Sequence, residues 1–136
     1  MSRTMYVLTD HQITEEQKRD AVETLGVKEI VITPNDIVKL WSNIPTTMSM
    51  EDLSLHIGPI LGWLDYSLNF RDVVFIQGDP TATFRIVSAI KSRYYLWLDV
   101  RCVASISKMV IEERLQPNGG IEKVTVLKHV RFRSYY

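Results

Sequence analysis

The sequence predicts an α/β domain in which helices flank a mostly parallel sheet and a β-hairpin is appended at the C-terminus. Over most of the chain, short apolar runs alternate with amphipathic segments of helical period. The run at 73–76, Val-Val-Phe-Ile, is apolar throughout, as expected of a strand buried on both faces of a parallel sheet. The last third differs, because two strand-like arms flank a turn-rich connection at 116–120.

Length and composition predict a single domain spanning residues 1–136. A chain of 136 residues with 46% hydrophobic and 24% charged residues is long enough for one core and too short for two comfortable ones. The formal net charge is zero, so no global field recruits long nucleic acid. Any anionic ligand must therefore be held by a local cluster of groups.

Several function classes are excluded by missing signals. The single cysteine, Cys102, rules out an internal disulfide, and its apolar surroundings predict burial. The histidines have no metal-ligand spacing, and no dinucleotide or P-loop glycine pattern occurs, so we expect no metal and no cofactor. No signal-peptide pattern and no run near the ~20 apolar residues of a membrane span is present. We expect a cytoplasmic protein without membrane contact.

The first third predicts a β-α-β unit. An apolar run at 5–8 indicates a strand, and the polar residues 9–11 form a loop at its carboxyl end. The Thr-Glu-Glu-Gln pattern at 14–17 is a capping box that opens a helix, and Gly26 ends it. Residues 27–33 supply the second strand, joined by a right-handed crossover if the strands are parallel. The apolar face of the helix is expected to carry Ala21, Val22 and Leu25.

Short helices follow the second strand. Residues 34–36 open one that ends before Pro45, because the residue preceding a proline disfavours helix. Ser49 is the candidate N-cap of the next, and the pair Gly58-Pro59 predicts a break inside it.

The longest predicted helix comes after the central strand. Apolar residues between Phe84 and Leu98, among them Tyr94 and Trp97, fall largely on one helical stripe, so the helix should run to about Asp99. A strand at 94–98 is the alternative. We prefer the helix, because 101–106 is a better buried strand and two adjacent strands would leave no room for a crossover.

The C-terminal arm is the densest basic segment. Strict alternation along a strand places His129, Arg131 and Arg133 on one face, with Val130 and Phe132 on the other. Such a face suits phosphate or a partner's acidic surface, or it stops an edge strand from pairing. The whole pattern is that of a small Rossmann-like sheet with an appended hairpin.

A glycine turn follows the central strand. Gln77, Gly78 and Asp79 precede a hydroxyl-rich helix start with Thr81 and Thr83. Free N–H groups and the helix dipole at such a place favour phosphate. The alternative is an ordinary strand-to-helix connection with a good cap.

Polar segments converge at one edge of the predicted sheet. Ligands of open α/β sheets bind outside the carboxyl ends of the strands, where three predicted loops, at 9–11, 77–83 and 105–108, would meet. They offer N–H groups, hydroxyls and one lysine, which are the donors that a phosphodiester needs. Two of these residues allow two interpretations: His11 is a general base or a solvated loop residue, and Lys108 contacts phosphate or points into solvent.

Five segments, in chain order, resemble the small single-domain CRISPR-associated ring nucleases of type III systems, which are CARF-like. The most specific are the Gln-Gly-Asp turn with its following Ala-Thr and the Lys-His-Val-Arg-Phe-Arg ending. The family tends to have a Thr-Thr-Lys-Arg-like stretch after the fourth strand, and here Ser105-Ile106-Ser107-Lys108-Met109 keeps a hydroxyl and the lysine. The segments are TEEQ, LGVKEIVITPNDIVKLWSNIP, VVFIQGDPTATFRIV, RCVASISK and LKHVRFRSY.

The resemblance implies a homodimer that binds cyclic tetra-adenylate, or another cyclic oligoadenylate, across its two-fold axis and cleaves it. It further implies metal-independent attack of a ribose 2′-hydroxyl on the adjacent phosphate, with Lys108, Ser107 and His11 as catalytic residues. Two alternatives stay open: a protein that sequesters the ligand without cutting it, and a regulatory protein whose hairpin docks on an effector. The expected ligand-binding residues are Thr9, Asp10, Gln77, Gly78, Asp79, Thr81, Thr83, Ser105, Lys128, His129 and Arg131.

Overall fold

The structure is a five-stranded, mostly parallel sheet flanked by helices, as the sequence predicts. The computed structural model describes residues 2–136, except for the side chains of residues 94–96, so the predicted place of Tyr94 on the apolar stripe of the long helix lies outside the described residues. None of the helices in this described part is long and apolar enough to cross a membrane. The elements are β1 (Arg3–Thr9), α1 (Glu15–Leu25), β2 (Val27–Ile32), α2 (Asn35–Ser42), α3 (Met50–His56), α4 (Gly58–Ser67), β3 (Val73–Gln77), α5 (Pro80–Leu98), β4 (Arg101–Leu115) and β5 (Ile121–Ser134).

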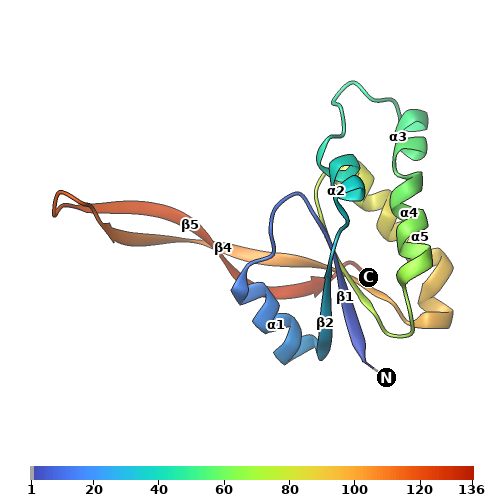
Figure 1. Cartoon of the computed structure of the whole chain (residues 1–136), viewed down its shortest axis with the longest axis horizontal. Helices are drawn as coiled ribbons and strands as arrows, with labels where there is room; N and C mark the ends of the chain where they lie inside the picture. The colour runs from blue at the N-terminus through green and yellow to red at the C-terminus, as the bar shows by residue number, and fades with distance from the viewer. Residues whose placement is uncertain (1) are drawn as a thin grey trace.

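Strand β3 lies in the middle of the sheet. The strand order is β2-β1-β3-β4-β5, with the first four strands parallel and β5 antiparallel to β4. Residues 73–76 of β3 are all buried, because helices cover both faces of the sheet (Figure 1). The prediction of a central strand buried on both sides is confirmed.

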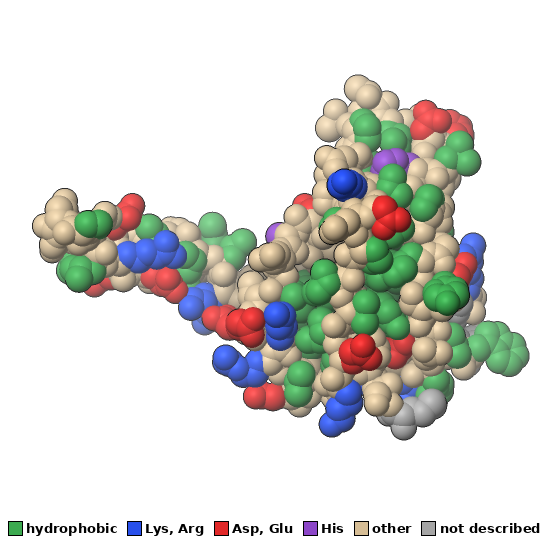
Figure 2. All heavy atoms as spheres, viewed as in Figure 1, with side chains coloured by type: hydrophobic (Ala, Val, Ile, Leu, Met, Phe, Trp, Pro, Cys, Tyr) green, Lys and Arg blue, Asp and Glu red, His purple; other side chains and the backbone are tan. Residues whose placement is uncertain are grey.

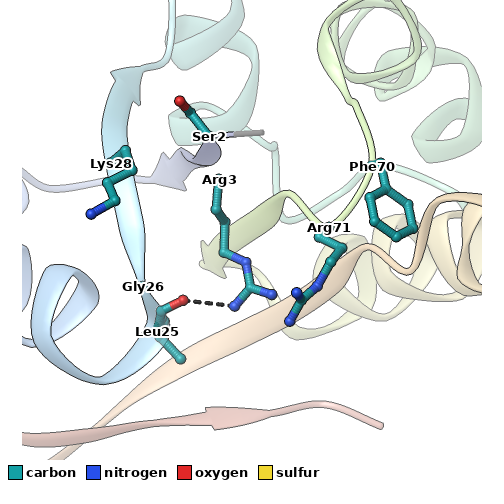
Figure 3. A pocket seen from close by; sticks show the side chains of 7 residues that line it. All are labelled: Ser2, Arg3, Leu25, Gly26, Lys28, Phe70 and Arg71. Atoms are coloured by element: carbon teal, nitrogen blue, oxygen red, sulfur yellow. Dashed lines mark hydrogen bonds between the residues drawn. The ribbon is translucent and has the colours of Figure 1, made fainter.

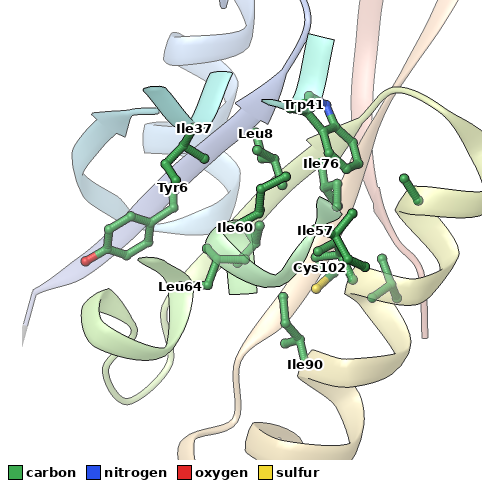
Figure 4. Close-up of a cluster of buried hydrophobic side chains, with 14 of the residues drawn as sticks. Tyr6, Leu8, Ile37, Trp41, Ile57, Ile60, Leu64, Ile76, Ile90 and Cys102 are labelled. Carbon is green, nitrogen blue, oxygen red and sulfur yellow. The ribbon is translucent and has the colours of Figure 1, made fainter. Parts of the chain in front are cut away.

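Two apolar cores occupy the two faces of the sheet. The larger one packs β-strand residues such as Leu8, Ile76 and Cys102 against α2 to α5 (Figure 4). The smaller one lies under α1 and includes Phe75. Cys102 is fully buried, and burial raises the pKa of its thiol to about 12, so it is an inert apolar residue as expected.

Local capping signals set the helix ends as predicted. The capping box at Thr14 is complete, since the Thr14 hydroxyl accepts from the Gln17 N–H and the Gln17 side chain accepts from the Thr14 N–H. Gly26 ends α1 at φ 70°, a left-handed conformation that glycine adopts without steric cost. Ser49 caps α3, and Pro59 stands in the first turn of α4.

Two predicted buried faces are partly wrong. Val22 of α1 is half exposed, because the helix turns Gln17 and Ala21, four residues apart, toward the sheet instead. In α5, Phe84 is 72% exposed, since it lies about 200° around the helix from buried Ile86. Trp97, in the last turn, is 82% exposed.

The β4–β5 pair forms an arm that projects from the body of the protein (Figures 1 and 2). Strand β4 pairs with β3 from Arg101 only as far as Val103, whereas its pairing with β5 continues to Leu115. The prediction that 105–108 is a loop is therefore wrong, because β5 supplies hydrogen-bond partners that extend β4 beyond the sheet. Residues 116–120 form the turn at the tip, as expected.

A β-bulge interrupts the arm where it joins the body. Ile106 pairs with Arg131 and Ser107 pairs with His129, which leaves Val130 without a partner. The extra residue turns His129 to the side of Phe132, and the two rings lie 4.6 Å apart. The predicted common face of His129, Arg131 and Arg133 is wrong for this reason.

Candidate functional site

Gly78 of the predicted phosphate turn allows a tryptophan to approach closely. The Trp41 Nε1–H donates to the Gln77 carbonyl oxygen at 3.0 Å. A Cβ atom on Gly78 would lie only 2.7 Å from Trp41 Nε1. The glycine is therefore explained by packing of α2 against the end of β3.

Asp79 fills the place that a phosphate would take at the start of α5. Its Oδ1 accepts from the Thr81 hydroxyl at 2.6 Å and from the Ala82 N–H at 2.9 Å. The hydrogen bond from Thr81 and that from Ala82 lower the pKa of Asp79, so a carboxylate anion occupies the helix start. This geometry fits the alternative interpretation, a strand-to-helix connection with a good cap, and Asp79 shapes the turn.

A different hollow gathers predicted site residues at the same edge of the sheet. It has a volume of about 510 Å³ and lies between α1 and the root of the β4–β5 arm. The predicted residues that line it are His11, Gln77, Ser105, Ser107, Lys128 and His129.

The remaining predicted residues lie elsewhere. An adjacent hollow shares His11, and a third, between α5 and the C-terminus, shares Gln77. Lys108 is exposed on the arm, directly opposite Lys128 in the strand register. Thr9 and Asp10 line the adjacent hollow, Gly78 and Thr83 line the third, and Asp79, Thr81, Lys108 and Arg131 line none of the three.

Three side chains from three elements form a hydrogen-bonded chain at the wall of the 510 Å³ hollow. Ser105 Oγ of β4 lies 2.6 Å from His129 Nδ1 of β5, and His129 Nε2 lies 2.7 Å from Asp20 Oδ2 of α1. The side chains of His129 and Asp20 are only 5% and 19% exposed. Serine, histidine and carboxylate in this order can relay a proton.

The positions of the hydrogens in the Ser105–His129–Asp20 hydrogen-bonded chain follow from which of its groups can donate and which can only accept. An ionised carboxylate only accepts, so the Nε2 atom of neutral His129 carries the hydrogen and Nδ1 is the acceptor. The Ser105 hydroxyl then donates to Nδ1. Gln17 Nε2 donates to Ser105 Oγ at 3.2 Å, which leaves this oxygen one lone pair for a ligand.

Asp20 is held in its ionised form. Burial would raise its pKa, but hydrogen bonds from His129 and Thr24 outweigh burial, and the pKa lies below its usual value. A negative charge therefore faces His129 at neutral pH, and it would stabilise the imidazolium form after proton transfer.

Two glutamines position Ser105. Besides the bond from Gln17, Gln77 Oε1 accepts from the Ser105 N–H at 3.0 Å. Pairing of β3 with β4 stops at Val103, so the Gln77 side chain satisfies a donor of β4 that no strand partner reaches.

Lys128, a cation that lines the 510 Å³ hollow, is neutralised by glutamates. Lys128 Nζ lies 3.0 Å from Glu112 Oε1 and 3.6 Å from Glu16 Oε1. The hydrogen bond and charge of Glu112 raise the pKa of Lys128, and those of Lys128 lower the pKa of Glu112, so both groups stay ionised. A phosphate must therefore displace a glutamate to reach Lys128.

Sequence reasoning missed Asp20 and Gln17. Both lie on α1, and Asp20 is 109 positions before its partner His129. One signal was present: Gln17, Asp20 and Ala21 follow the i, i+3, i+4 spacing of one helical face, next to the buried Ala21. Only the tertiary structure pairs that face with the arm.

Comparison with known proteins places the chain in a family. Residues 3–133 match the model of the uncharacterized protein MJ1673 family, and the chain belongs to this family. It is similar to the uncharacterized protein MJ1673 of Methanocaldococcus jannaschii, with 30% identity over 131 residues that cover 96% of this chain and 95% of the relative. No solved structure matches the chain significantly.

Gly78→Ala is expected to destabilise the fold by about 1–3 kcal/mol, because the new methyl group overlaps the Trp41 ring. Urea unfolding measures the free energy. Gly62→Ala is the matched control: Gly62 lies inside α4, and a Cβ atom there would meet nothing within 4 Å, so this change should stabilise by about 0.5–1 kcal/mol. Equal effects of the two changes would contradict the explanation of Gly78.

Asp20→Asn should reduce the loss of unfolding free energy that occurs as the pH is lowered. The folded-state pKa of Asp20 lies below its unfolded value, so its contribution is complete above about pH 4 and is lost as the pH falls through the folded pKa. Unfolding free energy measured from pH 7 downward should therefore fall more steeply in the wild type than in Asp20→Asn. Glu23→Gln, an exposed change on the same helix, should keep the wild-type slope.

Proposed function

We propose that this protein is a ring nuclease that binds a cyclic oligoadenylate, with cyclic tetra-adenylate as the preferred candidate, and opens the ring. The observation that carries the proposal is the Ser105–His129–Asp20 chain beside a hollow at the carboxyl edge of a parallel sheet, where α/β folds bind ligands. The resemblance of the sequence to CARF-like ring nucleases supplies the substrate class. In type III CRISPR defence, such a reaction would switch off the signal.

The proposed reaction needs no external nucleophile. A ribose O2′ bonds to the adjacent phosphorus, the P–O5′ bond breaks, and the products are a 2′,3′-cyclic phosphate and a 5′-hydroxyl. Ser105 Oγ accepts the 2′-hydroxyl proton through its remaining lone pair, while its own proton passes to His129 Nδ1. His11, at the rim of the same hollow, is assigned to protonate O5′.

Ser105 is thus the catalytic residue of the chain, and His129 and Asp20 act through it. This differs from the roles that the resemblance implies for Ser107 and Lys108. Ser107 lines the hollow and is kept as a phosphate ligand, whereas Lys108 lies outside it on the arm.

Lys128 is assigned to bind phosphate in place of its present partners. Exposed ion pairs contribute little to stability, so exchanging Glu16 or Glu112 for a phosphate oxygen costs little. A phosphodiester oxygen, like the carboxylate oxygen it replaces, is an ionised acceptor that forms a charge-assisted hydrogen bond with the lysine.

Wild-type protein incubated with labelled cyclic tetra-adenylate in EDTA should give linear product ending in a 2′,3′-cyclic phosphate. Ser105→Ala should lower the single-turnover rate about 10²- to 10⁴-fold, because it removes the proton acceptor. Ser92→Ala, an exposed serine of α5, should keep the wild-type rate. Intact but retained ligand would favour a sequestering protein, and no binding would reject both functions.

The pH profile of the rate distinguishes a catalytic role of the Ser105–His129–Asp20 hydrogen-bonded chain from a purely structural one. If His129 receives the proton, Asp20→Asn should shift the acidic limb of the rate profile as well as lower the rate. A lower rate with an unchanged profile would assign Asp20 to folding only.

We also propose a homodimer formed through the arm. An isolated two-stranded ribbon is marginally stable in water, yet this one exposes large apolar side chains that the strand register places on one face. Figure 2 shows hydrophobic side chains exposed along the arm. In a dimer, Lys108 and Arg131 of one arm could reach ligand bound by the other copy. The exposed apolar residues are Met109 (72%), Ile111 (71%), Leu115 (79%), Ile121 (66%) and Leu127 (70%).

Leu127→Glu should convert the dimer to monomer, because it places a charge in the middle of the apolar face. Analytical ultracentrifugation across a concentration series measures this, and Leu55→Glu, an equally exposed leucine on α3, should leave the dimer intact. A monomeric wild type would instead favour the regulatory alternative, in which the arm docks on a different protein.

A further inference from the structure

A second charged hollow lies at the opposite, amino edge of the sheet. It has a volume of about 430 Å³, and Arg3, Lys28 and Arg71 are among its lining residues. Figure 3 shows the guanidinium groups of Arg3 and Arg71 side by side and the Lys28 side chain directed away from them. No carboxylate is among its lining residues within the described part of the chain. The other lining residues are Ser2, Leu25, Gly26 and Phe70.

Arg3 is fixed in place by the end of α1. Its Nη1 donates to the Leu25 carbonyl oxygen at 2.6 Å, one of the acceptors that the last turn of a helix leaves open. The dashed line in Figure 3 marks this bond. The remaining guanidinium N–H groups are free to bind a ligand, since Arg3 has no other hydrogen-bond or ion-pair partner among the described residues.

Lys28 stands at a β-bulge. Arg3 pairs with Val27 and Thr4 pairs with Glu29, so Lys28 has no partner in β1. A bulge of this kind redirects a side chain out of the regular alternation. The irregularity thus places a cation at the hollow.

Arg71 adopts a backbone conformation that long side chains rarely take. Its φ is 64°, and its N–H donates to the Leu98 carbonyl oxygen at 2.6 Å. Residues held in the left-handed region often mark binding sites, because the surrounding structure must enforce the strain. Figure 3 shows its guanidinium group beside that of Arg3.

The nearby carboxylates are already bound to other groups. Asp72 accepts from the Thr4 and Asn69 N–H groups at 3.0 and 2.8 Å, and Asp99 pairs with Arg101 at 3.2 Å. Among residues 2–136 as described, no acidic side chain lies within ion-pair distance of Arg3, Lys28 or Arg71. Burial, followed by the charge of Arg71, lowers the pKa of Arg3, and the charges of Asp99 and Asp72 offset this only in part.

We propose that this hollow binds a phosphate dianion, either free or as the terminal group of a mononucleotide. A phosphate between Arg3 and Arg71 would accept hydrogen bonds from both guanidinium groups and cancel their repulsion. Lys28 adds a more distant positive charge at the rim, and the exposed ring of Phe70 offers a surface on which a base can stack. The site is separate from the hollow at the carboxyl edge and does not depend on the proposed ring nuclease activity.

Thermal unfolding in inorganic phosphate against chloride at matched ionic strength tests the proposal. A ligand of the native state raises Tm, so phosphate should raise it in the wild type. Phosphate also stabilises proteins by exclusion from their surface, so the rise is compared between variants. Arg71→Gly should show a smaller rise than the wild type, with affinity for phosphate reduced at least about tenfold, and should not lower Tm in chloride, since glycine tolerates φ 64°. Lys39→Gln, an exposed lysine of α2 that lines neither hollow, should keep the wild-type rise.

Adenosine monophosphate forms the second arm of the experiment. Tighter binding than inorganic phosphate, lost in Phe70→Ala, would identify a nucleotide as the ligand, and equal binding would identify free phosphate. Absence of a phosphate-specific rise in the wild type, or the same rise in Arg71→Gly, would overturn the proposal.

Discussion

The fold depends on the burial of β3 between two layers of helices. Its four apolar residues, Val73 to Ile76, belong alternately to the two cores, so neither core can form without this strand. The constraint extends to the residue that follows. The carbonyl oxygen of Gln77 holds Trp41, and its side chain holds the Ser105 N–H, so the end of β3 fixes both a helix and the candidate catalytic strand.

The bulge at Val130 links the arm to the site. Regular alternation would turn His129 away from Phe132, and then neither Ser105 nor Asp20 could reach its ring. One unpaired residue therefore creates a buried polar chain that joins α1, β4 and β5. Such a chain is costly when partly satisfied, and here every member has a partner.

A chain of zero net charge has two edges with different electrostatic character. At the carboxyl edge, Lys128 is balanced by Glu16 and Glu112, so an anionic ligand must compete with bound carboxylates. At the amino edge, Arg3 and Arg71 lie together without an acidic partner among the described residues. At the first edge, a ligand would be selected by its fit to the hollow and by its ability to displace a glutamate from Lys128. At the second edge, it would be selected by the two guanidinium groups and the Phe70 ring.

Local signals in the sequence predict the order of the elements and the ends of the helices, because capping boxes, terminal glycines and apolar periodicity act between near neighbours. The end of β4 is not predicted, since it depends on pairing with β5. The sequence also predicted the central strand, the burial of Cys102 and the hairpin, and it named Ser105 and His129 as site residues. Only the tertiary structure decided that Asp20 completes their chain, that Asp79 fills the supposed phosphate cradle, and that Arg3 meets Arg71. These contacts depend on strand register and on pairing between elements. Such features are set by residues far apart in the sequence, and the local sequence pattern does not predict them.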